Sequence, residues 1–113
     1  MSLDIELFDK YCTHCKRGDS VFSINITHNL GPMADRAGLY SVMWRPSENG
    51  FTKAYEVLDY LLDGLFSLGK EPEIYKRMNP ENGWGSYEYL VFAVREYIAA
   101  CKEYPNAMIK VSR

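Results

Sequence analysis

Two long segments with amphipathic helical periodicity constrain the fold of this chain more than any other feature. In residues 52–69 and 86–104, apolar side chains recur at spacings of three and four, which places them on one face of a helix. Thr52 is a suitable N-cap and Gly69 a suitable C′ residue, just past the end of the first helix, and the second helix ends before Pro105. The expected apolar stripes are Ala54, Val57, Leu58, Leu61, Leu62, Leu65 and Phe66 in the first helix, and Tyr87, Leu90, Val91, Val94, Ile98 and Cys101 in the second.

Alternating apolar and polar residues near both ends of the chain predict short β-strands. Residues 3–8, 22–27 and 107–112 show this period of two. The segment between the first two strands, residues 11–19, is polar and contains Gly18. We therefore expect these strands to form an antiparallel hairpin with a loose connection.

The order of these elements predicts an α+β fold in a single domain, residues 1–113. Two shorter helices are expected at residues 30–38, capped by Asn29, and at residues 72–78. Two or three short strands cannot bury both faces, so we predict a small antiparallel sheet covered on one face by the two long helices plus the short ones. The predicted core packs Leu58, Leu61, Leu62, Leu65, Leu90, Val91, Val94 and Ile98 against Ile5, Leu7, Ile24 and Ile109.

The composition excludes several classes of protein. Apolar residues make up 47% of the 113 residues and charged residues 25%, as in ordinary globular domains. The formal charge of −2 is neither the positive surplus of a non-specific nucleic-acid binder nor the negative surplus of a DNA mimic. No apolar run approaches the ~18 residues of a membrane span. A secretory signal is not recognisable and the cysteine count, three, is odd, so we expect a cytoplasmic protein.

Cys12 and Cys15 form the first candidate site. Two cysteines separated by two residues can supply two ligands to a zinc ion, but a closed zinc site needs four. The remaining candidate ligands are His14, His28 and Cys101, and Cys101 lies on an expected apolar stripe. Because a second pair is missing, we predict no stoichiometric zinc and no other cofactor, and we interpret the pair as two loop cysteines.

A second candidate site combines three segments that are rich in aromatic and amide side chains. The second strand ends at His28 and the second long helix begins near Ser86, so antiparallel packing would bring these segments to one rim of the sheet. The helix N-terminus and Arg45 would favour an anionic group, and Trp44 or Trp84 could stack on a ring. In the alternative interpretation, the tryptophans pin long loops to the core. The candidate ligand-binding residues are Thr27, His28, Asn29, Trp44, Arg45, Asn82, Trp84, Tyr87 and Glu88.

Several short motifs occur together between residues 25 and 113. They are Asn25-Ile26-Thr27-His28-Asn29-Leu30, Met33-Ala34, Ala37-Gly38 with Tyr40, Trp44-Arg45-Pro46, Asn79-Pro80, Asn82-Gly83-Trp84-Gly85, Tyr87-Glu88 and Val111-Ser112-Arg113. In this combination the chain resembles small uncharacterised proteins of phage, prophage and gut-bacterial genomes, over roughly residues 21–113. The resemblance implies a phage-related origin, but no activity, cofactor or site residue, and it does not include the cysteine pair.

Three functions remain open. The first is a non-enzymatic module that binds a small polar or anionic ligand or a peptide. The second is a small enzyme in which His28 acts with Glu88 or Glu48 as acid and base. The third is a homodimeric interaction protein that uses some of its nine tyrosines. The sequence shows no nucleophile–base pair, and this favours the non-enzymatic binding module over the enzyme. A cluster of His28, Arg45, Trp84 and Glu88 would support the first two functions, and their dispersal the third.

Overall fold

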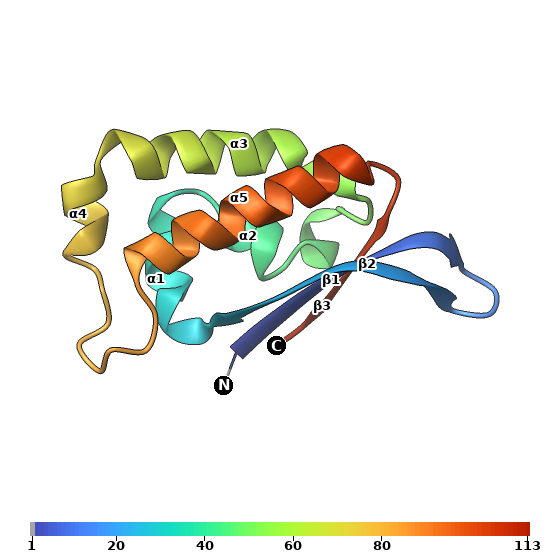
Figure 1. Ribbon diagram of the computed structural model, residues 1–113, viewed down its shortest axis with the longest axis horizontal. Coiled ribbons are helices and arrows are strands. Elements are labelled where there is room, and N and C mark those ends of the chain that lie inside the picture. The colour runs from blue at the N-terminus through green and yellow to red at the C-terminus, as the bar shows by residue number, and fades with distance from the viewer. Residues whose placement is uncertain (1) are drawn as a thin grey trace.

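The three segments with alternating apolar residues form one antiparallel sheet (Figure 1). The computed structural model describes residues 2–113. Its elements are β1 (Ser2–Cys12), β2 (Arg17–Thr27), the 3₁₀ turn η1 (His28–Leu30), α1 (Gly31–Arg36), α2 (Tyr40–Met43), the 3₁₀ turn η2 (Ser47–Asn49), α3 (Ala54–Lys70), α4 (Pro72–Lys76), α5 (Tyr87–Glu103) and β3 (Met108–Ser112). The strand order is β2-β1-β3, so the first strand is central. The predicted α+β fold is confirmed.

The register of the sheet explains why one face is buried. Apolar residues of β1 lie opposite apolar residues of both neighbours, and directly opposed residues in an antiparallel pair point to the same face. The opposed apolar pairs are Leu3 with Ile26, Ile5 with Ile24, Leu7 with Phe22, Ile5 with Val111 and Leu7 with Ile109. Polar residues such as Asp4, Glu6 and Lys110 alternate with them and occupy the other face.

The long helix α5 covers the apolar face, as predicted. It contacts β2, and α3 packs on α5. The Ser86 side chain caps α5 by accepting a hydrogen bond from the Tyr89 amide at 3.1 Å. The predicted stripe is buried at every position except Val91, which is half-buried. The stripe also includes Ala93, Tyr97 and Ala100.

The first long helix starts later and ends later than predicted. Thr52 is not its cap, because α3 begins at Ala54 with Lys53 as the N-cap residue. Here the Glu56 carboxylate accepts hydrogen bonds from the amides of Thr52 at 3.0 Å and Lys53 at 2.8 Å, and these bonds lower the pKa of Glu56. Gly69 does not end the helix, which continues to Lys70.

The buried face of α3 is rotated from the one that we predicted. Ala54, Val57, Leu61 and Leu68 are buried, but Leu62 is 38% exposed and Phe66 is 72% exposed. Leu58 and Leu65 are half-buried. The apolar stripe of α3 is wider than the surface that α5 covers. Successive residues are about 100° apart around the helix axis, so Leu62 lies outside the contact with α5 when Leu61 is at its centre.

Two local details also differ from expectation. The hairpin connection is tight, because β1 extends to Cys12 and pairs there with Arg17. The turn is therefore residues 13–16 and not a loose loop over residues 11–19. After β2, it is Thr27 and not Asn29 that caps the following turn, since the Thr27 hydroxyl oxygen accepts a hydrogen bond from the Asn29 amide at 3.3 Å.

The two leucines at the centre of α3 allow the burial assignment to be tested. Leu61→Ala should lower the free energy of unfolding by about 2–5 kcal/mol, because it leaves a cavity in the core. Leu62→Ala removes a partly exposed side chain and should cost less than half as much. Chemical denaturation of both variants measures the difference, and equal losses would contradict the assigned face.

Two buried tyrosines offer a matched test of hydrogen bonding in the core. The Tyr97 hydroxyl is buried without a hydrogen-bond partner among residues 2–113, and burial raises its pKa. Tyr97→Phe should therefore increase the free energy of unfolding by about 1 kcal/mol. Tyr75→Phe should decrease it by a similar amount, because the Tyr75 hydroxyl lies 2.8 Å from the Ser67 hydroxyl. Denaturation midpoints that fall for both variants would contradict the first expectation.

Candidate functional site

The N-terminal end of α5 lies beside the C-terminal end of β2, as the sequence predicted. The Asn29 side-chain amide donates to the Trp84 carbonyl at 3.5 Å. Gly85 has a φ of +101°, and a Cβ there would come within 2.7 Å of the Thr27 side chain. The close approach of this loop to β2 therefore depends on glycine.

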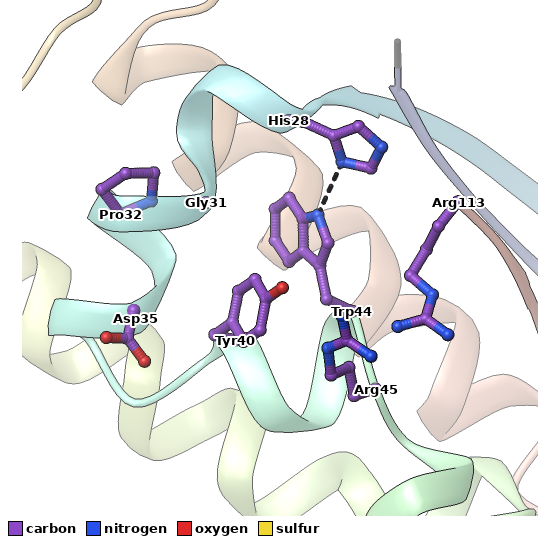
Figure 2. A pocket seen from close by; sticks show the side chains of 8 residues that line it. All are labelled: His28, Gly31, Pro32, Asp35, Tyr40, Trp44, Arg45 and Arg113. Atoms are coloured by element: carbon purple, nitrogen blue, oxygen red, sulfur yellow. Dashed lines mark hydrogen bonds between the residues drawn. The ribbon is translucent and has the colours of Figure 1, made fainter.

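The end of β2 borders an open groove of about 830 Å³ between η1, α1 and α2, which we call the arginine groove (Figure 2). It combines an aromatic wall with cationic side chains from distant parts of the chain. The lining residues are His28, Gly31, Pro32, Asp35, Tyr40, Trp44, Arg45 and Arg113.

A hydrogen bond from Trp44 orients His28 at one side of this groove. The Trp44 indole N–H donates to Nδ1 of His28 at 3.0 Å (Figure 2). An indole nitrogen can only donate, so Nδ1 accepts and the proton of the neutral imidazole is on Nε2. Trp44 itself is 2% exposed and stacks on Tyr40, with ring centroids 5.5 Å apart. Its ring faces are thus covered, and its position matches the interpretation in which a tryptophan pins a loop to the core.

Two arginines share one carboxylate at the opposite side of the arginine groove. Oε2 of Glu48 lies 2.8 Å from Nη1 of Arg45 and 3.5 Å from Nη1 of Arg113. Hydrogen bonds to Glu48 and then to Tyr40 raise the pKa of Arg45, and the bond to Arg45 lowers the pKa of Glu48. With two guanidinium groups and one carboxylate, the cluster has a net charge of +1. Arg113 was not predicted as a site residue, since only the tertiary fold brings β3 next to η2.

A second hollow of about 490 Å³ adjoins the arginine groove at His28. Trp84, which is 70% exposed, stands over it, and Oδ1 of Asn82 holds the backbone there by accepting from the Trp84 amide at 2.9 Å. The lining residues are Ser2, Asn25, Thr27, His28, Asn29, Asn82 and Trp84. The predicted single site is therefore divided between two neighbouring hollows, and His28 lines both. Trp44 and Arg45 line the arginine groove, and the second hollow contains the predicted residues Thr27, Asn29, Asn82 and Trp84.

Two of the candidate residues lie outside both hollows. The Tyr87 side chain points into the core, where its hydroxyl donates to the Leu68 carbonyl at 2.7 Å. Glu88 is exposed in the first turn of α5 and lines neither hollow. The helix geometry explains both positions. Tyr87 lies on the face of α5 that packs on the core, whereas the next residue, Glu88, is turned toward solvent.

The proposed acid and base partners of His28 occupy other positions. Glu48 is bound to Arg45 and Arg113, and Nδ1 of His28 is bound to Trp44. Across the described part of the chain, no hydrogen bond or ion pair joins His28 to either Glu48 or Glu88. The groove therefore presents hydrogen-bond donors rather than a histidine–carboxylate pair.

The three cysteines lie in two very different environments. Cys101 lies on the buried face of α5, and burial raises the pKa of its thiol to about 12. Cys12 and Cys15 are exposed at the hairpin turn. Hydrogen bonds from the Cys15 thiol and from the Cys15 and His14 amides lower the pKa of Cys12. Within residues 2–113, no group of three or more histidine, cysteine or acidic side chains is placed to hold a metal ion.

Comparison with known proteins leaves the family open. No model of a known protein family, no curated protein and no solved structure matches this chain. The resemblance to phage and gut-bacterial proteins therefore stays a prediction. None of the helices in residues 2–113 has the length and apolar character required to cross a membrane.

The tautomer of His28 can be tested directly. Trp44→Phe keeps an aromatic ring but removes the indole N–H, so the Nε2–H tautomer of His28 should be less strongly favoured than in the wild type. Long-range ¹H–¹⁵N NMR of the imidazole measures the tautomer, and the loss of one hydrogen bond should lower stability by about 1 kcal/mol. If the neutral imidazole of His28 in the wild-type protein carried its proton on Nδ1, the hydrogen bond from Trp44 to His28 would be wrong.

Proposed function

We propose that this protein is a non-enzymatic module that binds a small anionic ligand, with a carboxylate or phosphate group, in the arginine groove. The observation that carries the proposal is the pair of guanidinium groups that shares a single carboxylate beside an open groove. An anionic ligand would neutralise the charge that Glu48 leaves uncompensated. Arginine also presents paired N–H donors that match a carboxylate or phosphate.

The other donors of the groove support the same ligand class. The Nε2–H of His28 is available, because Nδ1 is occupied by Trp44. Arg45 and Arg113 have side chains that are 43% and 41% exposed, so part of each guanidinium remains open to a ligand. The volume of about 830 Å³ lies within the range of small-molecule sites.

The remaining wall of the groove restricts the shape and charge of the ligand. Pro32 and Tyr40 provide apolar surface for a ring or a short hydrocarbon part. Figure 2 shows Asp35 across the groove from Arg113. A carboxylate at that end disfavours a second negative group, so the proposal is a ligand with one anionic end. A cytoplasmic location and a phage-related origin accompany this proposal as expectations from the sequence.

A second candidate function is self-association. It is favoured by large apolar side chains that project from the outer surfaces of the long helices, namely Tyr55, Leu62 and Phe66 on α3 and Phe92 on α5. Such side chains are common at interfaces between proteins. This candidate and ligand binding in the arginine groove use different surfaces, so they are compatible.

Ligand binding is tested with inorganic phosphate and benzoate as probes. Both should shift the NMR signals of the His28 and Trp44 side chains in a saturable manner. Arg45→Gln and Arg113→Gln should each weaken binding about tenfold, because each removes a charged hydrogen-bond donor.

The matched control is Arg95→Gln, which removes an exposed arginine from the solvent face of α5. This variant should bind both probes as the wild type does. If all three variants bind equally well, or if neither probe shifts the signals at millimolar concentration, the proposed function is wrong.

A further inference from the structure

The β1–β2 hairpin ends in a turn that holds two exposed cysteines away from the body of the protein. Figure 1 shows the hairpin extending past the helical layer, which makes the molecule elongated, with a long dimension of 45 Å against 27 and 22 Å. Cys12 is the last residue of β1, and Cys15 lies within the connecting turn. Both side chains are exposed, and the arginine groove uses neither.

The backbone of the turn holds the two cysteines next to each other. The Cys15 amide donates a hydrogen bond to Sγ of Cys12 at 3.4 Å. Lys16 has a φ of +55°, a left-handed conformation that is unusual for a lysine, and it returns the chain to β2. The ladder closes directly behind the turn, where Cys12 pairs with Arg17. The pair is therefore arranged as two neighbouring sulfur ligands before any metal binds.

A single chain supplies only half of the ligands for zinc. Structural zinc sites are tetrahedral and closed by four protein ligands. Over residues 2–113, no third ligand converges on the cysteine pair, and Cys101 lies on the buried face of α5. The prediction from the sequence that zinc is not bound depended on this missing second pair, so it concerns a site within one chain.

We propose that two copies of this chain bind one zinc ion between their hairpin tips, with Cys12 and Cys15 of each copy as its four thiolate ligands. A two-fold symmetric contact presents the same surface twice, so a second copy supplies the pair that the first one lacks. Because the hairpin extends beyond the helices, two tips can meet without contact between the two helical layers. This inference is independent of ligand binding in the arginine groove.

The positive side chains around the turn compensate the negative charge of this zinc complex. Four thiolates and Zn²⁺ together carry a charge of −2. In each copy, Lys16 and Arg17 directly follow the second cysteine and are exposed, so two copies bring four cations to the site. Any thiol that is protonated releases its proton to solvent when it binds the metal, and no electrons are transferred.

Zinc titration of the reduced, purified protein, combined with light scattering during size-exclusion chromatography, tests the proposal. We expect half an equivalent of zinc per chain, a mass that doubles with zinc, and a return to the monomer after chelation. Cobalt as a probe should give the strong visible absorption of a tetrahedral thiolate site. Cys12→Ser and Cys15→Ser should each abolish both metal binding and the zinc-dependent dimer.

Two control variants separate this site from its alternatives. His14→Ala should bind zinc as tightly as the wild type, since the proposed ligand set contains no histidine, and Arg45→Gln should dimerise normally. One zinc per monomeric chain, loss of binding in His14→Ala, or no zinc retained above the Cys12→Ser level would each overturn the proposal. A dimer that forms without zinc and is unchanged in Cys12→Ser would also overturn it, and would point to the exposed side chains of α3 and α5.

Discussion

The one-sided sheet is the constraint on which the rest of the structure depends. Ile5 and Leu7 of the central strand lie opposite apolar partners in both neighbours, and Leu3 lies opposite Ile26 of β2. The apolar face of the sheet must therefore be covered by another layer of the structure. The buried stripe of α5 supplies it. The direction of α5 along β2 then determines where the preceding loop lies. Through this chain of contacts, the burial of the sheet places Trp84 and Asn82 next to the end of β2.

His28 lies at the boundary between this core and the two hollows. Trp44 is buried among core residues, yet its one polar atom reaches the rim and binds the imidazole. A buried N–H without a partner would cost free energy, so the same hydrogen bond satisfies the core and orients a donor toward the groove. The orientation of His28 therefore depends on the hydrogen bond from the buried Trp44.

The candidate binding regions lie at the surface, where packing of the hydrophobic core constrains the choice of residues least. The arginine groove is formed by residues of η1, α1 and α2, the residues just after α2 and the residue after β3, and the cysteine pair lies at the far end of the hairpin. A third region is the outer surface of α3, where Phe66 is 72% exposed. The hydrophobic packing that stabilises the fold does not require any of these features, which distinguishes them from buried groups such as Cys101.

The sequence by itself determined the elements and their class, because helical and strand periodicity are local properties. The extent of α5, its Ser86 cap region, the three strands and the two-layer α+β arrangement all followed from spacing. The sequence could not decide which part of a wide apolar stripe is buried, and so Leu62 was placed in the core although it is 38% exposed. Only the tertiary structure brought Arg113 to Glu48 and divided the predicted site at His28. These outcomes depend on contacts between residues far apart in the chain, which no local spacing pattern specifies.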